Sequence, residues 1–164
     1  IRSFIKTYQF PALIIHACNN YGSFQNSEKL ISKTILNAIN NKNIIIYDKG
    51  KQKREWIYVK DMVRAIYFVL NNGKIFETYN IGSGIEQQNI EIINLICGYL
   101  EKIKKIKCHH LKKFIPNARL GHDYRYALNC EKIQKLGWNC IYDFQDSINK
   151  TIEWYIKNKS KYDE

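Results

Sequence analysis

The stretch PALIIHACNNYG (residues 11–22) is an apolar run that ends in small and polar residues. Its β-branched Ile14 and Ile15 follow Pro11 and predict a short buried strand over residues 12–17. We expect residues 19–22 to form a polar loop at the end of this strand, or simply a turn. Loops at strand ends commonly carry binding groups, so this loop is a first candidate for a functional site.

The segments that follow alternate between helix and strand patterns. Apolar residues spaced by three and four predict helices over 28–41, 60–72, 90–100, 131–136 and 144–156. Strand-like segments are 44–47, 52–59, 77–81 and 124–128, the first two forming a hairpin or bend. Ser27 is the expected cap of the first helix, and Gly73 the left-handed stop of the second. This alternation predicts an α/β fold.

Composition indicates one globular unit. The 164 residues are 45% hydrophobic and 13% aromatic with only 2 Pro and 8 Gly, which excludes a disordered or fibrous chain. The apolar runs are too short for a membrane helix, which needs about 20 residues. The first residues show neither a start Met nor a signal peptide, so we expect a chain truncated at its front.

The net charge of +11 raises nucleic acid as a partner. However, 21 of the 26 cations are Lys, whereas Arg is the residue that reads bases and phosphates bidentately. The Lys-rich run 102–113 is expected to be a solvated helix end and loop. We therefore predict no nucleic-acid partner, while a non-catalytic basic binding module stays an alternative.

Cysteine usage favours a reducing, cytoplasmic setting. The five Cys form an odd set without a C-x-x-C pair, which fits neither a disulfide framework nor a zinc ribbon. Cys108, His109 and His110 are adjacent, and consecutive residues rarely converge on one metal. We expect no metal site.

No catalytic constellation follows from spacing. Gly82-Ser83-Gly84 lacks the rest of a dinucleotide fingerprint, and the Tyr-x-x-x-Lys match at Tyr47 and Lys51 spans a turn. Cations and amides do stand at loop positions, where they suit an anionic, hydroxyl-rich ligand such as a nucleotide sugar, although each could be an ordinary surface residue. They are Asn19, Asn20, Lys29, Arg54, Asn89, Arg119 and His122.

Six blocks across the chain resemble the C-terminal half of the dTDP-glucose 4,6-dehydratase family, which belongs to the extended short-chain dehydrogenases/reductases. The blocks, in order, are NNYGxxQxxEKLI (19–31), YxxGKQxREWIYVxD (47–61), GKxxETYNIG (73–82), NIE (89–91), RxGHDxRYA (119–127) and LGW (136–138). Related nucleotide-sugar epimerases share NYG and YNIG. A related epimerase or decarboxylase fragment therefore stays an alternative.

The resemblance implies the end of an NAD-binding Rossmann domain over residues 1–22. Residues 23–164 would be mainly a smaller α/β nucleotide-sugar-binding domain with short returns to the Rossmann sheet. The complete protein would be a lyase that binds NAD and dTDP-glucose, acts as a homodimer and contacts no membrane. Its glycine fingerprint, acidic pair and Tyr-x-x-x-Lys would lie upstream of Ile1, so this fragment alone would be inactive.

The resemblance also assigns binding residues position by position. Asn19 would contact substrate, and Asn20 the NAD side. The other substrate-binding positions would be Lys29, Leu30, a nucleobase strand of Ile45, Ile46 and Tyr47, the diphosphate ligands Arg54 and Arg119, and Asn89, Gly121 and His122.

Some positions depart from the family pattern. Ser23 replaces a Pro, Glu55 an Asp, and Ala118 and Leu120 replace the Asp and Pro of a DRPGH block. These changes affect the expected shape of the diphosphate pocket. A truncated product that folds poorly, because the sheet it should pack on is missing, is a further alternative.

Overall fold

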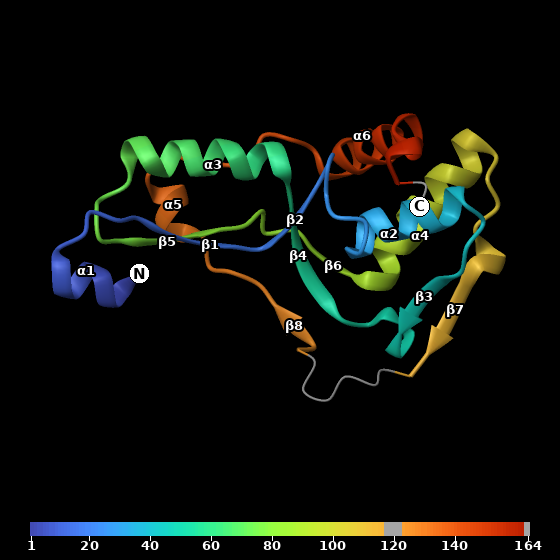
Figure 1. Cartoon of the computed structure of the whole chain (residues 1–164), viewed down its shortest axis with the longest axis horizontal. Coiled ribbons are helices and arrows are strands. Elements are labelled where there is room, and N and C mark those ends of the chain that lie inside the picture. The colour runs from blue at the N-terminus through green and yellow to red at the C-terminus, as the bar shows by residue number, and fades with distance from the viewer. Residues whose placement is uncertain (117–122, 163–164) are drawn as a thin grey trace.

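A computed structural model describes residues 1–116 and 123–162 of the chain (Figure 1). Its helices are α1 (Arg2–Tyr8), α2 (Leu30–Ile39), α3 (Val59–Asn72), α4 (Asn89–Lys104), α5 (Glu131–Lys135) and α6 (Phe144–Lys157), with 3-10 turns at Asp48–Gly50, His109–Leu111 and Lys159–Tyr162. The strands are β1 (Ile14–Ala17), β2 (Asn19–Tyr21), β3 (Ile44–Tyr47), β4 (Lys53–Tyr58), β5 (Thr78–Ile81), β6 (Glu86–Gln88), β7 (Lys112–Ile115) and β8 (Arg125–Tyr126).

The strands form three small sheets, most of them paired in parallel. β1 pairs with β5, and β3 pairs with β7. In the third sheet β4 pairs in parallel with β2 and β8 and antiparallel with β6. Parallel pairs need crossover connections, which the helices supply. The predicted α/β class is confirmed.

Two apolar cores lie on either side of β4. The larger core is built mainly on α2, α4 and α6, on the right of Figure 1, and the smaller on α3, α5, β1 and β5, on the left. The alternating side chains of β4 serve both, because Trp56 and Tyr58 pack into the larger core and Ile57 into the smaller. Figure 1 shows β2 and β4 crossing the middle of the molecule, so the two strands connect the cores.

The long periodic helices are confirmed, and the errors lie at their ends. Ser27 is not the cap of α2, since Lys29 occupies the N-cap without a side-chain hydrogen bond. Gly73 is extended (φ −75°) and not left-handed. By contrast, α4 begins with a reciprocal capping box between Gln88 and Glu91, which satisfies two backbone donors at its first turn.

Three predictions about loops and strand pairing are wrong because the pairing partners of these segments are distant in sequence. Asn19–Tyr21 is not a loop but strand β2, paired with Trp56–Tyr58. β3 pairs with β7 and not with β4, so of the predicted hairpin or bend only the bend is found, as the 3-10 turn Asp48–Gly50. As a result, the end of the Lys-rich run, Lys112 and Lys113, lies in a strand rather than in a loop.

In the described parts of the chain, no helix has both the length and the apolar character needed to cross a bilayer.

Candidate functional site

A cavity of about 450 Å³ lies where β2, β4, the start of α2 and the start of α4 meet. Six residues singled out from the sequence line it together: Asn19, Asn20, Lys29, Leu30, Arg54 and Asn89. Gln25 and Trp56 complete its wall. The polar groups that the sequence placed on separate segments are thus brought together.

Backbone pairing explains this convergence. The parallel register of β2 on β4 sets Asn19 opposite Trp56, so the amide lies beside the strand that carries Arg54. The backbone N–H of Asn89, the first residue of α4, donates to the carbonyl of Gln52 at 3.0 Å, which holds the helix start against β4. Strand pairing and a helix start therefore fix three walls of the cavity.

The loop before α2 supplies the fourth wall. Ser32 Oγ donates to the carbonyls of Asn26 (2.6 Å) and Lys29 (3.0 Å) from inside the first turn of the helix. Ser32 is fully buried, so these bonds anchor the loop to the larger core. The Lys29 ammonium therefore extends from a backbone that is held in place.

Arg54 contributes a buried positive charge to the cavity wall. Its side chain is only 5% exposed, and its guanidinium donates to the carbonyls of Lys53 (2.7 Å), Asp123 (2.7 Å) and Tyr124 (3.2 Å). The guanidinium also lies 4.4 Å from the centre of the Tyr126 ring, a cation–π contact. These contacts fix the orientation of a planar cation, the geometry suited to a phosphate.

Three buried polar atoms on the lining residues have no hydrogen-bond partner in the described structure. They are the acceptors Asn20 Oδ1 and Gln25 Oε1 and the donor Trp56 Nε1. Buried polar groups are nearly always paired, so an unpaired cluster around one cavity indicates a polar ligand. Gln25 and Trp56 were not predicted as lining residues, although both stand inside the blocks NNYGxxQ and REW.

A second pocket of about 280 Å³ adjoins the first through Leu30, which lines both. Ile45 and Tyr47 of β3 also line it, and both are partly exposed. Ile46 is 2% exposed, packs into the larger core and is not among the residues that line this pocket. The prediction that the whole β3 segment 45–47 contacts the ligand stays a prediction.

Arg119, Gly121 and His122, together with the departures at Ala118 and Leu120, lie outside the described residues.

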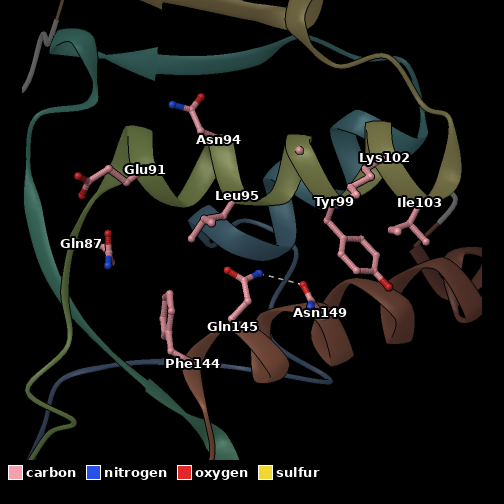
Figure 2. A pocket seen from close by; sticks show the side chains of 11 residues that line it. Gln87, Glu91, Asn94, Leu95, Tyr99, Lys102, Ile103, Phe144, Gln145 and Asn149 are labelled. Carbon is pink, nitrogen blue, oxygen red and sulfur yellow. Dashed lines mark hydrogen bonds between the residues drawn. The ribbon is translucent and has the colours of Figure 1, made fainter.

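The largest cavity, about 870 Å³ between α4 and α6, is a weaker candidate (Figure 2). Some of its polar side chains bond to one another or to nearby groups, as in the bond from Gln145 Nε2 to Asn149 Oδ1 (3.1 Å). The Tyr99 hydroxyl likewise donates to Glu153. None of its lining residues carries a buried unpaired polar atom. This cleft therefore lacks the signature of a polar ligand site.

The cysteines and the metal-ligating side chains of the described residues do not form a reactive centre. All five cysteines are free, and burial raises the pKa of Cys18, Cys108 and Cys140 to about 12, which keeps these thiols protonated and poorly nucleophilic at neutral pH. No cluster of metal-ligating side chains occurs in the part of the chain that the structure describes. Gly82–Gly84 leads into strand β6 and not directly into a helix, so it does not form a dinucleotide-binding turn.

Comparison with known proteins gives a consistent set of relatives. A model of the NAD dependent epimerase/dehydratase family matches residues 1–82, half of the chain. The dTDP-glucose 4,6-dehydratase of Haemophilus influenzae is 39% identical over 166 residues, covering 98% of this chain and 49% of the relative. The dTDP-glucose 4,6-dehydratase 1 of Escherichia coli K12 is 43% identical over 160 residues, covering 96% and 44%. The chain thus spans about half the length of the curated relatives it matches.

Solved structures show the same relationship. The dTDP-glucose 4,6-dehydratase of Streptomyces venezuelae, solved with NAD bound, superposes with a TM-score of 0.92 at 32% identity, covering 99% of this chain and 49% of that one. The enzyme of Bacillus anthracis, in complex with NAD, gives 0.86 at 35% identity, with 97% and 49% covered. The UDP-glucose 4-epimerase of Thermotoga maritima, 20% identical with a TM-score of 0.82, shares the fold.

Proposed function

Because the chain belongs to the NAD dependent epimerase/dehydratase family, we propose that it supplies the nucleotide-sugar-binding part of a dTDP-glucose 4,6-dehydratase, a lyase. One observation carries this proposal above the others. Two cations, four amides and an aromatic donor from four separate segments line the same cavity, and three of their buried polar atoms lack partners in the described structure. A charged, hydroxyl-bearing ligand fits such a lining.

The ligand would extend from the first cavity into the second. Lys29 and Arg54 would hold the diphosphate, because both carry charge that complements phosphate oxygens. The nucleobase would pack beyond Leu30 against Ile45 and Tyr47, whose apolar surfaces suit a planar ring. The sugar would then lie among the amides of Asn19, Asn20 and Gln25.

NAD fits this arrangement through Asn20. The buried Asn20 Oδ1 has no donor, while Asn20 Nδ2 is fixed on the carbonyl of Cys18 at 3.1 Å, so a hydroxyl or carboxamide N–H of the cofactor would complete it. When bound, NAD would accept and return a hydride. In this proposal the acid–base groups lie in the part of the relatives that this chain does not match. Asn20 only binds and orients the cofactor.

The smaller core bears a surface that suits a further sheet. In the described structure β1 pairs only with β5, and two parallel strands are rarely stable alone. A groove beside β1 is lined by apolar residues, and its Ile66 and Leu70 are 45% and 69% exposed. We propose that this lobe belongs to the cofactor-binding domain and packs against the remainder of that domain. The chain would then return to the cofactor-binding domain after residue 22, as the predicted short returns to the Rossmann sheet require.

The groove predicts assembly with the unmatched half of a relative. We expect the chain to co-purify with the unmatched part of the Haemophilus influenzae dehydratase when the two are co-expressed, since each would cover apolar surface of the other. The double variant Ile66→Glu, Leu70→Glu should lose this association. Ile103→Glu on α4, also about half exposed, is the control and should retain it. Equal recovery of the double variant would contradict the proposed packing.

The binding function itself is tested by titrating the chain with dTDP-glucose in a calorimeter, after circular dichroism has shown a cooperative unfolding transition. Lys29→Met should weaken binding by roughly threefold to tenfold, the effect of one exposed cation on a diphosphate. The loss should shrink as salt is raised, because screening weakens exposed charge pairs. Lys150→Met, on α6 away from the cavity, is the control. No heat of binding from the unmodified chain would refute the proposed function.

A further inference from the structure

Both the main chain and the side chain of Gln25 are hydrogen-bonded. The hydroxyl of Tyr155, fully buried in the larger core, donates to the main-chain carbonyl of Gln25 at 2.6 Å. The side-chain Nε2 of Gln25 donates to the carbonyl of Asn20, also at 2.6 Å. Because that bond requires a donor, it decides which amide atom is nitrogen and which is oxygen. The orientation of the Gln25 amide is therefore fixed.

This orientation leaves the side-chain oxygen of Gln25 without a hydrogen-bond donor. Gln25 Oε1 is buried without a donor, and the residue lines the first cavity together with Asn20 and Trp56. A carbonyl oxygen can only accept, so the missing partner must be a group that donates a hydrogen. Phosphate oxygens that are ionised only accept, and they cannot satisfy it. The partner must therefore be a hydroxyl or an N–H.

The position of Gln25 separates the nucleobase from the sugar as the source of such a donor, since the donor of NAD is already assigned to Asn20 in the proposed arrangement. The nucleobase in the proposed arrangement lies in the second pocket, which Gln25 does not line. The sugar lies in the first cavity, which it does. On the basis of the proposed function, we infer that Gln25 is a specificity-determining residue whose Oε1 accepts a hydrogen bond from a hexose hydroxyl of the nucleotide sugar.

Two ligands and one isosteric variant test this assignment. Gln25→Met preserves the length of the side chain but removes both the Oε1 acceptor and the Nε2 donor to the Asn20 carbonyl. It should raise the Kd of the chain for dTDP-glucose by roughly tenfold, the effect of losing one hydrogen bond to a buried group. The Kd for dTDP, which has no hexose, should stay within about twofold of the unmodified value, as a ligand lacking the hydroxyl gains nothing from the acceptor. Gln145→Met, in the cleft between α4 and α6, is the matched control and should leave both values unchanged.

The hydroxyl itself can be identified with dTDP-glucose analogues that each lack one hydroxyl. One analogue should bind the unmodified chain and Gln25→Met equally well.

Three other outcomes would each contradict a different claim. Equal weakening of dTDP and dTDP-glucose would show that Gln25 supports the loop or reads the nucleoside, and would overturn the assignment to the sugar. Unchanged binding of both ligands would remove Gln25 from the site. Failure of the unmodified chain to bind either nucleotide would overturn the proposed function itself.

Discussion

Glu55→Ala is expected to lower the free energy of unfolding by about 3 kcal/mol, since each buried N–H left without an acceptor costs roughly 1–3 kcal/mol. Glu55 is 1% exposed, and its two carboxylate oxygens accept from the backbone N–H of Gly84 (2.7 Å) and of Leu128 (2.9 Å). The carboxylate thus ties β4 to two other segments from inside the protein. Urea denaturation followed by circular dichroism at neutral pH measures the loss.

The side chain of Glu55 is longer than that of the Asp it replaces in the family pattern, and it has room because residue 82 is glycine. A Cβ at Gly82 would collide with Glu55 Oε1. Glu86, the residue opposite Glu55 on β6, is the control because its carboxylate forms an exposed ion pair with Arg125. Glu86→Ala should cost clearly less than Glu55→Ala, because its bidentate pair with Arg125 is partly exposed and leaves no buried N–H without an acceptor. A loss as large as that of Glu55→Ala would show that the buried contacts do not carry the effect.

Local sequence patterns predicted helices α2 to α6, because their information is contained within each segment, whereas α1 was not predicted. The apolar spacing of α3 and α6 is set by which face meets a core, and both helices occur within a few residues of the predicted bounds. β2 could not be predicted in this way. Its sequence, Asn19–Tyr21, has two polar residues and gains its strand conformation from pairing with β4, more than thirty residues later. Pairings that are distant in sequence leave no local periodicity.

The site was predictable to the extent that its residue types are chemically distinctive. Lys29, Arg54 and Asn89 were identified because cations and amides at loop or strand ends suit a phosphorylated ligand, and the resemblance placed them in order. Gln25 and Trp56 were missed for a physical reason. Their importance rests on a buried polar atom that lacks a partner, and the absence of a partner appears only once the surrounding structure is known.

Arg54→Ala is expected to weaken dTDP-glucose binding by roughly 1.5–3 kcal/mol, which is a tenfold to more than hundredfold rise in Kd. The effect should exceed that of Lys29→Met because a buried, oriented guanidinium acts in a medium where charge interactions are less screened. Arg54→Lys should recover only part of the affinity, since an ammonium keeps the charge but not the fixed, planar geometry of the guanidinium. Calorimetric titration of the three proteins at one salt concentration gives the comparison.

A structural role for Arg54 predicts a different result. The same guanidinium donates to the carbonyls of Asp123 and Tyr124, so its removal also frees the segment that leads into β8. If support of that segment were its whole contribution, Arg54→Ala would lower the unfolding midpoint but bind dTDP-glucose normally at temperatures where it is folded. If Arg54 instead contacts the phosphates, thymidine, which has no phosphate, should bind the variant and the unmodified chain equally well. The ligand dTDP should bind the variant more weakly. Equal binding of dTDP by both proteins would remove Arg54 from the diphosphate site.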